Sequence, residues 1–199
     1  SSLSTSDYGD LSGLTECMLD YCEPRHISLS LPSLRADSFS AELMERVQKT
    51  RKSGLTFACE AGTQRLRDVI NKNIREEDVL HACEIAFQGG WNNVKLYFMM
   101  GLPTETYEDL DGISEICKKV AYCWRENTPN RARGVRITAS ASCFVPKPQT
   151  PFQWDAQDTL EQFREKQAHL KVVMKTKNVT YNWHDAETSV LEGVIARGD

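Results

Sequence analysis

Strand-like and helix-like hydrophobic patterns alternate along this chain, and that order limits its fold more than any other feature. The strand-like runs cover 55–59, 94–100, 135–141 and 179–183. Between them, apolar residues recur at helical spacing, as in Val79, Leu80, Cys83, Ala86 and Phe87. Strands that alternate with helices form parallel sheets with right-handed crossovers. We therefore expect an α/β barrel, part of a barrel or a doubly wound sheet.

The same alternation extends toward the N-terminal end. Ile27, Leu29 and Leu31 alternate as in a strand, and helical spacing follows over 43–47. Residues 1–7 fit the tail of another strand, with a helix expected over 11–21. We therefore expect a single domain spanning 1–199, whose barrel is incomplete at its N-terminal side.

Composition excludes several classes of protein. The net charge of −4 is spread along the chain, so no basic face is predicted for DNA or an anionic membrane. The longest apolar run, 94–102, is interrupted by Lys95 and is too short to span a bilayer. Seven cysteines, an odd number without repeated spacing, indicate a reducing cytoplasm rather than a disulfide framework. Nor do the cysteines predict a metal site within this chain.

Polar or glycine-containing sequence follows nearly every predicted strand. In parallel βα folds the loops at the carboxyl ends of the strands share one crevice, so chemistry is expected there. Gly62 and Gly101 would allow close ligand approach or positive φ, and each would offer free N–H groups to an anion at a helix start. Taken alone, each of the polar residues at these strand ends also has a structural interpretation. Glu60 could cap the following helix, and Glu105 could belong to a helix start. Asp185 could cap a helix, with His184 as an ordinary loop histidine.

Four stretches of the sequence resemble radical S-adenosylmethionine (SAM) proteins of the cobalamin-binding and methylthiotransferase-like groups. Residues 57–72 are similar to their "E-S/A-G-S/T, then L, then N-K" stretch, and 95–106 to their "F-x-x-G-x-P-G/T-E-T" turn. Arg35-Ala36-Asp37 matches an Arg-x-Asp, and 146–151 matches "P-x-P-x-T-P". Residues 184–199 are similar to the tail of one cobalamin-binding subfamily of unassigned reaction, in which a cobalamin-binding-type region lies upstream.

This resemblance implies a partial (βα)6 TIM-like barrel in which a [4Fe–4S] cluster binds SAM. The cluster reduces SAM to methionine and a 5′-deoxyadenosyl radical, with electrons from a donor such as flavodoxin or ferredoxin. Three cysteines at C-x3-C-x2-C hold the cluster in the family, and this sequence has no such triplet. We therefore expect the first strand and the cluster loop to precede Ser1, and this chain alone to be inactive.

The resemblance also implies positions for SAM-binding residues. Those expected near the methionine moiety, its carboxylate or the substrate are Ser4, Ser6, Asp7 and Arg35. Those expected along the ribose, the methionine side and the adenine are Glu60, Gly62, Gly101, Phe144 and Val145. Thr104 stands where the family usually has glycine in "P-G-E-T", and Cys59 where many relatives have proline or an aliphatic residue.

Two other interpretations stay open at this point. A conventional βα-barrel hydrolase or lyase would use Glu60 and Glu105 as an acid/base pair, with His184 assisting. A non-catalytic scaffold would bind a nucleotide-like ligand or a protein partner instead. The substrate, whether a small molecule or a macromolecule, and the type of reaction are not specified by the sequence.

Overall fold

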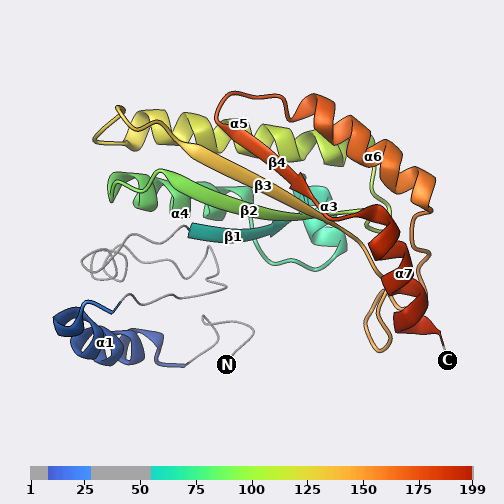
Figure 1. The fold of residues 1–199 in the computed structure, drawn as a ribbon, viewed down its shortest axis with the longest axis horizontal. Coiled ribbons are helices and arrows are strands. Elements are labelled where there is room, and N and C mark those ends of the chain that lie inside the picture. The colour runs from blue at the N-terminus through green and yellow to red at the C-terminus, as the bar shows by residue number, and fades with distance from the viewer. Residues whose placement is uncertain (1–8, 28–54, 199) are drawn as a thin grey trace.

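A parallel sheet of four strands forms the centre of the computed structural model, which describes residues 9–27 and 55–198 (Figure 1). The strands are β1 (Leu55–Glu60), β2 (Asn93–Met100), β3 (Arg136–Cys143) and β4 (Val179–Trp183). They lie in the order β1-β2-β3-β4, and every neighbouring pair is parallel. The four predicted strands between residues 55 and 183 are therefore confirmed, as is the α/β class.

Helices connect and flank these strands. They are α1 (Leu11–Cys22), the 3-10 turn η2 (Glu23–Arg25), α3 (Gln64–Val69), α4 (Glu76–Gln88), α5 (Tyr107–Asn127), α6 (Leu160–Val173) and α7 (Ala186–Arg197). The strand expected over 27–31, the helix over 43–47 and the strand tail over 1–7 fall almost wholly outside the described residues. The six-stranded partial barrel stays a prediction, because the described residues show four strands.

Alternation along each strand separates an apolar face from a polar one. Phe57, Leu96 and Ile137 are at most 1% exposed and pack with side chains of α4, α5 and α6 in one core. The alternate residues form what we call the inner face of the sheet. Its members are Thr56, Ala58, Asn93, Lys95, Tyr97, Met99, Arg136, Thr138, Ser140, Ser142, Thr180 and Asn182. Helices α4, α5 and α6 therefore cover one side of the sheet (Figure 1), and the inner face is mostly polar.

All seven cysteines are free thiols. Burial raises the pKa of Cys59 to about 12 and that of Cys117 to about 12, so both stay protonated in the core. Among the described residues, no three histidine, cysteine or acidic side chains lie together in a way that could hold a metal ion. Nor does any helix in the described part of the chain have the length and hydrophobicity to cross a bilayer.

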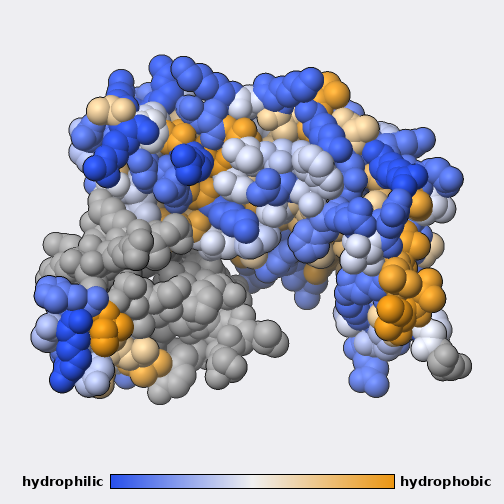
Figure 2. All heavy atoms as spheres, in the orientation of Figure 1, coloured by the Kyte–Doolittle hydropathy of each residue, from blue (hydrophilic) through white to orange (hydrophobic). Residues whose placement is uncertain are grey.

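Helix α7 packs on the core by one side and leaves apolar side chains on the other. Ala186 and Val190 contact the main core. Leu191, Val194 and Ile195 are 57%, 63% and 71% exposed, and they form the apolar patch that Figure 2 shows near the C-terminal end. These three side chains therefore contribute little to the core of the described chain.

Candidate functional site

Glu60 ends β1 in a strained turn. Its φ is 65°, the pairing with β2 shifts register at this residue, and the Ala61 N–H donates to the Cys59 carbonyl at 2.8 Å. A γ-turn with positive φ at a non-glycine residue costs roughly 1–3 kcal/mol. The carboxylate meets Lys72 Nζ at 2.9 Å, while Thr63 caps α3. The interpretation of Glu60 as a helix cap is therefore wrong, and the turn directs its side chain to the rim of the sheet instead.

Gly62 packs against a helix. A Cβ on it would lie 2.1 Å from the Asp109 carbonyl oxygen and 2.5 Å from the Ile113 nitrogen. A Cβ on Gly112 of α5 would lie 2.6 Å from the Gly62 oxygen in return. The two glycines therefore let the loop after β1 lie directly on the backbone of α5. Close packing accounts for Gly62, and its expected place beside SAM stays a prediction.

Gly101 forms the turn after β2. Its φ is 80°, and its N–H donates to Glu105 Oε1 at 2.8 Å. A Cβ there would meet the Phe163 ring at 2.6 Å and the Asp158 carboxylate at 2.8 Å. The expectation of a free Gly101 N–H is therefore wrong, because a carboxylate from the same loop already occupies it.

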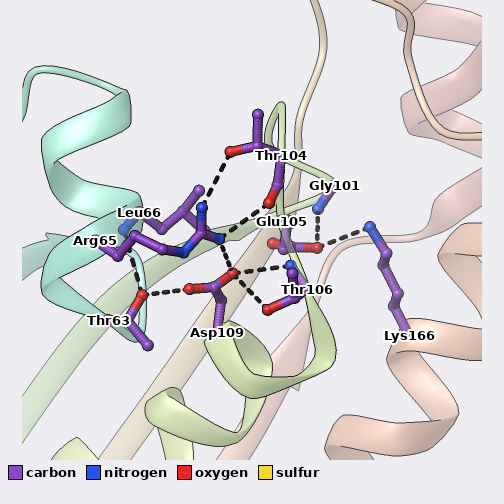
Figure 3. A network of polar contacts seen from close by, with 9 residues as sticks. All are labelled: Thr63, Arg65, Leu66, Gly101, Thr104, Glu105, Thr106, Asp109 and Lys166. Carbon is purple, nitrogen blue, oxygen red and sulfur yellow. Dashed lines mark hydrogen bonds and ion pairs between the residues drawn. The ribbon is translucent and has the colours of Figure 1, made fainter.

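Glu105 is a buried structural carboxylate. Its side chain is 1% exposed and pairs with Lys166 Nζ at 2.8 Å (Figure 3). Lys166 also contacts Asp158 at 2.7 Å. Burial raises the pKa of Glu105, although the hydrogen bond from Lys166 opposes that rise. Glu60 and Glu105 belong to separate ion pairs, so nothing in this geometry supports them as one acid/base pair.

Asp109 joins the loops that follow β1 and β2 (Figure 3). It accepts hydrogen bonds from the Thr63 hydroxyl and from Arg65, and from the backbone N–H and hydroxyl of Thr106 at 2.8 and 2.9 Å. Arg65 also donates to the Thr104 carbonyl at 2.9 Å. Desolvation acts to raise the pKa of Asp109, but these hydrogen bonds outweigh it and lower that pKa. One buried carboxylate thus fixes two neighbouring loops of the rim.

Thr104 adopts a backbone conformation that favours glycine. Its φ is 65°, which is unfavourable for a β-branched residue. We expect Thr104→Gly to raise the free energy of unfolding by about 1 kcal/mol and the melting temperature by about 2–4 °C. Thr128→Gly, at φ −75°, is the control and should lower both values in the same thermal and chemical denaturation measurements. A lower melting temperature for Thr104→Gly would mean that the Thr104 side chain contributes more than the strain costs.

A small apolar cluster lies at the ends of β1, β2 and β3. Its buried members are Ala61, Leu66, Leu102 and Phe144. Phe144 packs edge to face on Phe152, with ring centroids 6.2 Å apart, and Val145 is half-buried beside it. Glu60 and Gly62 flank Ala61, and Gly101 precedes Leu102, so the described residues predicted to bind SAM from 60 to 145 share one rim.

The other predicted site residues are not part of this apolar cluster or lie outside the described residues. Asp185 caps α7 by accepting from the Thr188 N–H at 2.8 Å, which confirms the cap interpretation. His184 is exposed, and its carbonyl accepts from Gln167 at 2.8 Å. The remaining four candidates lie outside the described residues: Ser4, Ser6, Asp7 and Arg35.

Several polar residues of the rim were not predicted from the sequence. Thr106 and Asp109 have the spacing of a capping box, which could have indicated that Asp109 turns back on the loop. Arg67 is only 1% exposed and donates to the Ala61 carbonyl at 2.8 Å. No local pattern predicts this burial, because its acceptor is fixed by the turn at Glu60.

Comparison with known proteins gives one family. The sequence model of the radical SAM superfamily matches residues 6–117, more than half of the chain. A protein of Methanocaldococcus jannaschii, described only as uncharacterized, is 33% identical over 191 residues. That match covers 96% of this chain but 39% of the relative, so the chain spans well under half of the relative's length. With its parallel α/β sheet and the motifs at its strand ends, this chain belongs to the radical SAM superfamily.

Proposed function

We propose that this chain is the SAM-facing part of a radical SAM enzyme that cleaves SAM reductively to methionine and a 5′-deoxyadenosyl radical. One electron enters and the bond between the sulfur and the 5′ carbon breaks, with a flavodoxin- or ferredoxin-like protein as donor. The observation that carries this proposal is the shared rim, where residues after β1, β2 and β3 pack into one cluster. Family membership supplies the class of reaction.

The rim has groups that suit an adenosyl ligand. The Glu60 side chain is 24% exposed, so its carboxylate can accept hydrogen bonds from ribose hydroxyls while it stays paired with Lys72. The partly buried Met99 and Phe152 pack against the apolar cluster and offer an apolar surface to a purine base. Such sites combine an apolar lining with a few placed polar groups. In this proposal Glu60 orients the ribose, and Phe144 and Val145 pack near the base.

An iron–sulfur cluster does not fit the described residues. They contain no set of three cysteines arranged for a metal, and the sequence has no C-x3-C-x2-C. We propose that the cluster cysteines belong to a part of the polypeptide outside these 199 residues, and that a six-stranded partial barrel forms with that part. Cobalamin stays a prediction from resemblance, since neither the family match nor the description of the relative names it.

The test uses the whole polypeptide, reconstituted anaerobically with iron and sulfide and reduced with dithionite. We expect Glu60→Gln to lower kcat/KM for SAM at least about tenfold, measured as 5′-deoxyadenosine formation, because a charged hydrogen-bond acceptor is worth about 1.5–3 kcal/mol. Glu165→Gln, on an exposed position of α6, should leave the rate unchanged. The 199-residue chain alone should form no 5′-deoxyadenosine.

Two results would contradict the proposal. If Glu60→Gln forms 5′-deoxyadenosine at the unmodified rate, Glu60 does not bind the ribose. If the reconstituted polypeptide shows no absorption of a four-iron centre and releases no 5′-deoxyadenosine, the enzyme assignment fails. Equal melting temperatures for the two glutamine variants would show that a changed rate does not come from unfolding.

A further inference from the structure

The inner face of the sheet carries side chains in rows, because neighbouring parallel strands align their residues. Thr56, Lys95, Thr138 and Thr180 are Cα partners across all four strands. The residues of this row are not part of the main core, whose members lie at the alternate positions. Lys95 therefore lies between two threonines, Thr56 and Thr138, in a row across the inner face.

A small pocket opens at this row and at the amino ends of the strands. Its volume is about 200 Å³, and its polar lining consists of Thr56, Asn93, Lys95, Arg136 and Thr138. Pockets for whole drug-sized ligands are larger, about 300–1,000 Å³. The pocket therefore suits a single small group, and all five polar side chains can donate hydrogen bonds to it.

The two cations of this pocket lack a carboxylate partner among the residues that the structure describes. Lys95 Nζ lies 4.6 Å from the centroid of the Tyr97 ring, and none of the described residues that line the pocket is acidic. Elsewhere in the described chain, lysines such as Lys72 and Lys166 pair with carboxylates. Two positive side chains that line one pocket with hydroxyl and amide donors, and with no acid among the described residues, favour an anion there.

The pocket lies far from the rim where SAM is expected. Lys95 precedes Gly101 by six residues, and a strand rises about 3.3 Å per residue, so the two positions are roughly 20 Å apart along β2. The space between them is lined by the polar inner face, including the 39% exposed Tyr97. An extended molecule could thus reach from the rim to the pocket along the sheet.

We propose that this pocket binds an anionic group, a phosphate or a carboxylate, at the end of the substrate distant from the reacting carbon. The identity of the bound molecule as substrate rests on the proposed function, whereas the anion site itself needs neither SAM nor a cluster. The proposal predicts a hydrophilic, negatively charged substrate rather than a lipid-like one. Lys95 and Arg136 would supply the charge, with Thr56, Thr138 and Asn93 as neutral donors.

The test titrates the ¹⁵N-labelled 199-residue chain with sodium phosphate at constant ionic strength and follows amide chemical shifts. We expect saturable shifts at 55–56, 93–95 and 136–138, with a dissociation constant in the millimolar range. Lys95→Met should weaken phosphate binding at least about tenfold, the change expected when a charged hydrogen-bond donor is lost. Lys171→Met is the matched control, because Lys171 also lies over an aromatic ring, Trp183 at 4.0 Å, but outside the pocket.

Acetate in a parallel titration separates the two sources of anion: tighter binding of phosphate indicates a phosphorylated substrate, and tighter binding of acetate a carboxylate. Linear shifts without saturation, or shifts spread over other surfaces, would overturn the proposal. So would equal affinity of the unmodified chain and Lys95→Met. These outcomes say nothing against SAM cleavage, so the two proposals fail separately.

Discussion

We expect Gly62→Ala to destabilise the fold more than a methyl group added at any other position of this rim. The new Cβ would lie 2.1 Å from the Asp109 carbonyl oxygen, which is backbone and part of α5. Overpacking costs about 1–3 kcal/mol where side chains can move, and here the loop or the helix must shift instead. We expect a loss of about 3 kcal/mol or more and a fall in melting temperature of roughly 6–12 °C.

Gly112→Ala tests the same contact from the other side. In the interior of an exposed helix, glycine to alanine stabilises by about 1 kcal/mol. Here the Cβ would lie 2.6 Å from the Gly62 oxygen, so we expect destabilisation instead. Gly134→Ala is the control, since the φ of Gly134 is 65° but no atom of the described residues would lie within 4 Å of the new Cβ, and its cost should be about 1 kcal/mol. Stabilisation by Gly112→Ala would show that the loop does not rest on α5.

The strands could be predicted because local pattern and tertiary environment agree in them. Residues 94–100 are apolar at nearly every position, yet Lys95 and Tyr97 lie on the inner face while Val94, Leu96 and Phe98 enter the core. The start of α6 also has a local signal, since Thr159 and Gln162 form its capping box. In both cases the residues that decide the structure are close in sequence.

The candidate site could be predicted in position but not in detail. That Glu60 and Gly101 share a rim follows from parallel strands alone. That Glu105 occupies the Gly101 N–H depends on Lys166, which is 61 residues further along the chain and supplies the balancing charge. Gly112 offered a signal, because a glycine inside a 21-residue helix is unfavourable unless something packs on it.

Asp109→Asn is expected to give the largest loss among the polar substitutions at the rim. The Asp109 side chain is 2% exposed and accepts from Thr63, Arg65 and Thr106. An amide in its place removes the charge and turns one acceptor into a donor that faces other donors. We expect a cost of about 2–4 kcal/mol, within the range for a buried charged group that loses its partners. Asp111→Asn is the control on α5, since Asp111 is 53% exposed and should cost under about 1 kcal/mol.

The same variant should change how stability depends on pH. The pKa of Asp109 is lowered in the folded state from its ordinary value of 3.8, so the unfolded chain takes up the proton first as pH falls. The stability that Asp109 contributes is therefore fully present above the unfolded pKa and is lost as pH falls through the folded one. Glu105 shifts the pH dependence of stability in the opposite direction, because its folded pKa is raised above 4.5. This contribution is the same in the unmodified chain and in Asp109→Asn.

The difference in the free energy of unfolding between the unmodified chain and Asp109→Asn isolates the contribution of Asp109 from that of every other carboxyl group. Urea denaturation at pH 6, 5, 4 and 3 gives the free energy of unfolding of each protein, and the gap between them should be constant from pH 6 to 5 and then narrow below pH 4. A gap that stays constant down to pH 3 would mean that Asp109 titrates alike in the folded and unfolded chain. In that case the loops after β1 and β2 would not be held by its charge, and the rim would owe its shape to the contact between Gly62 and α5.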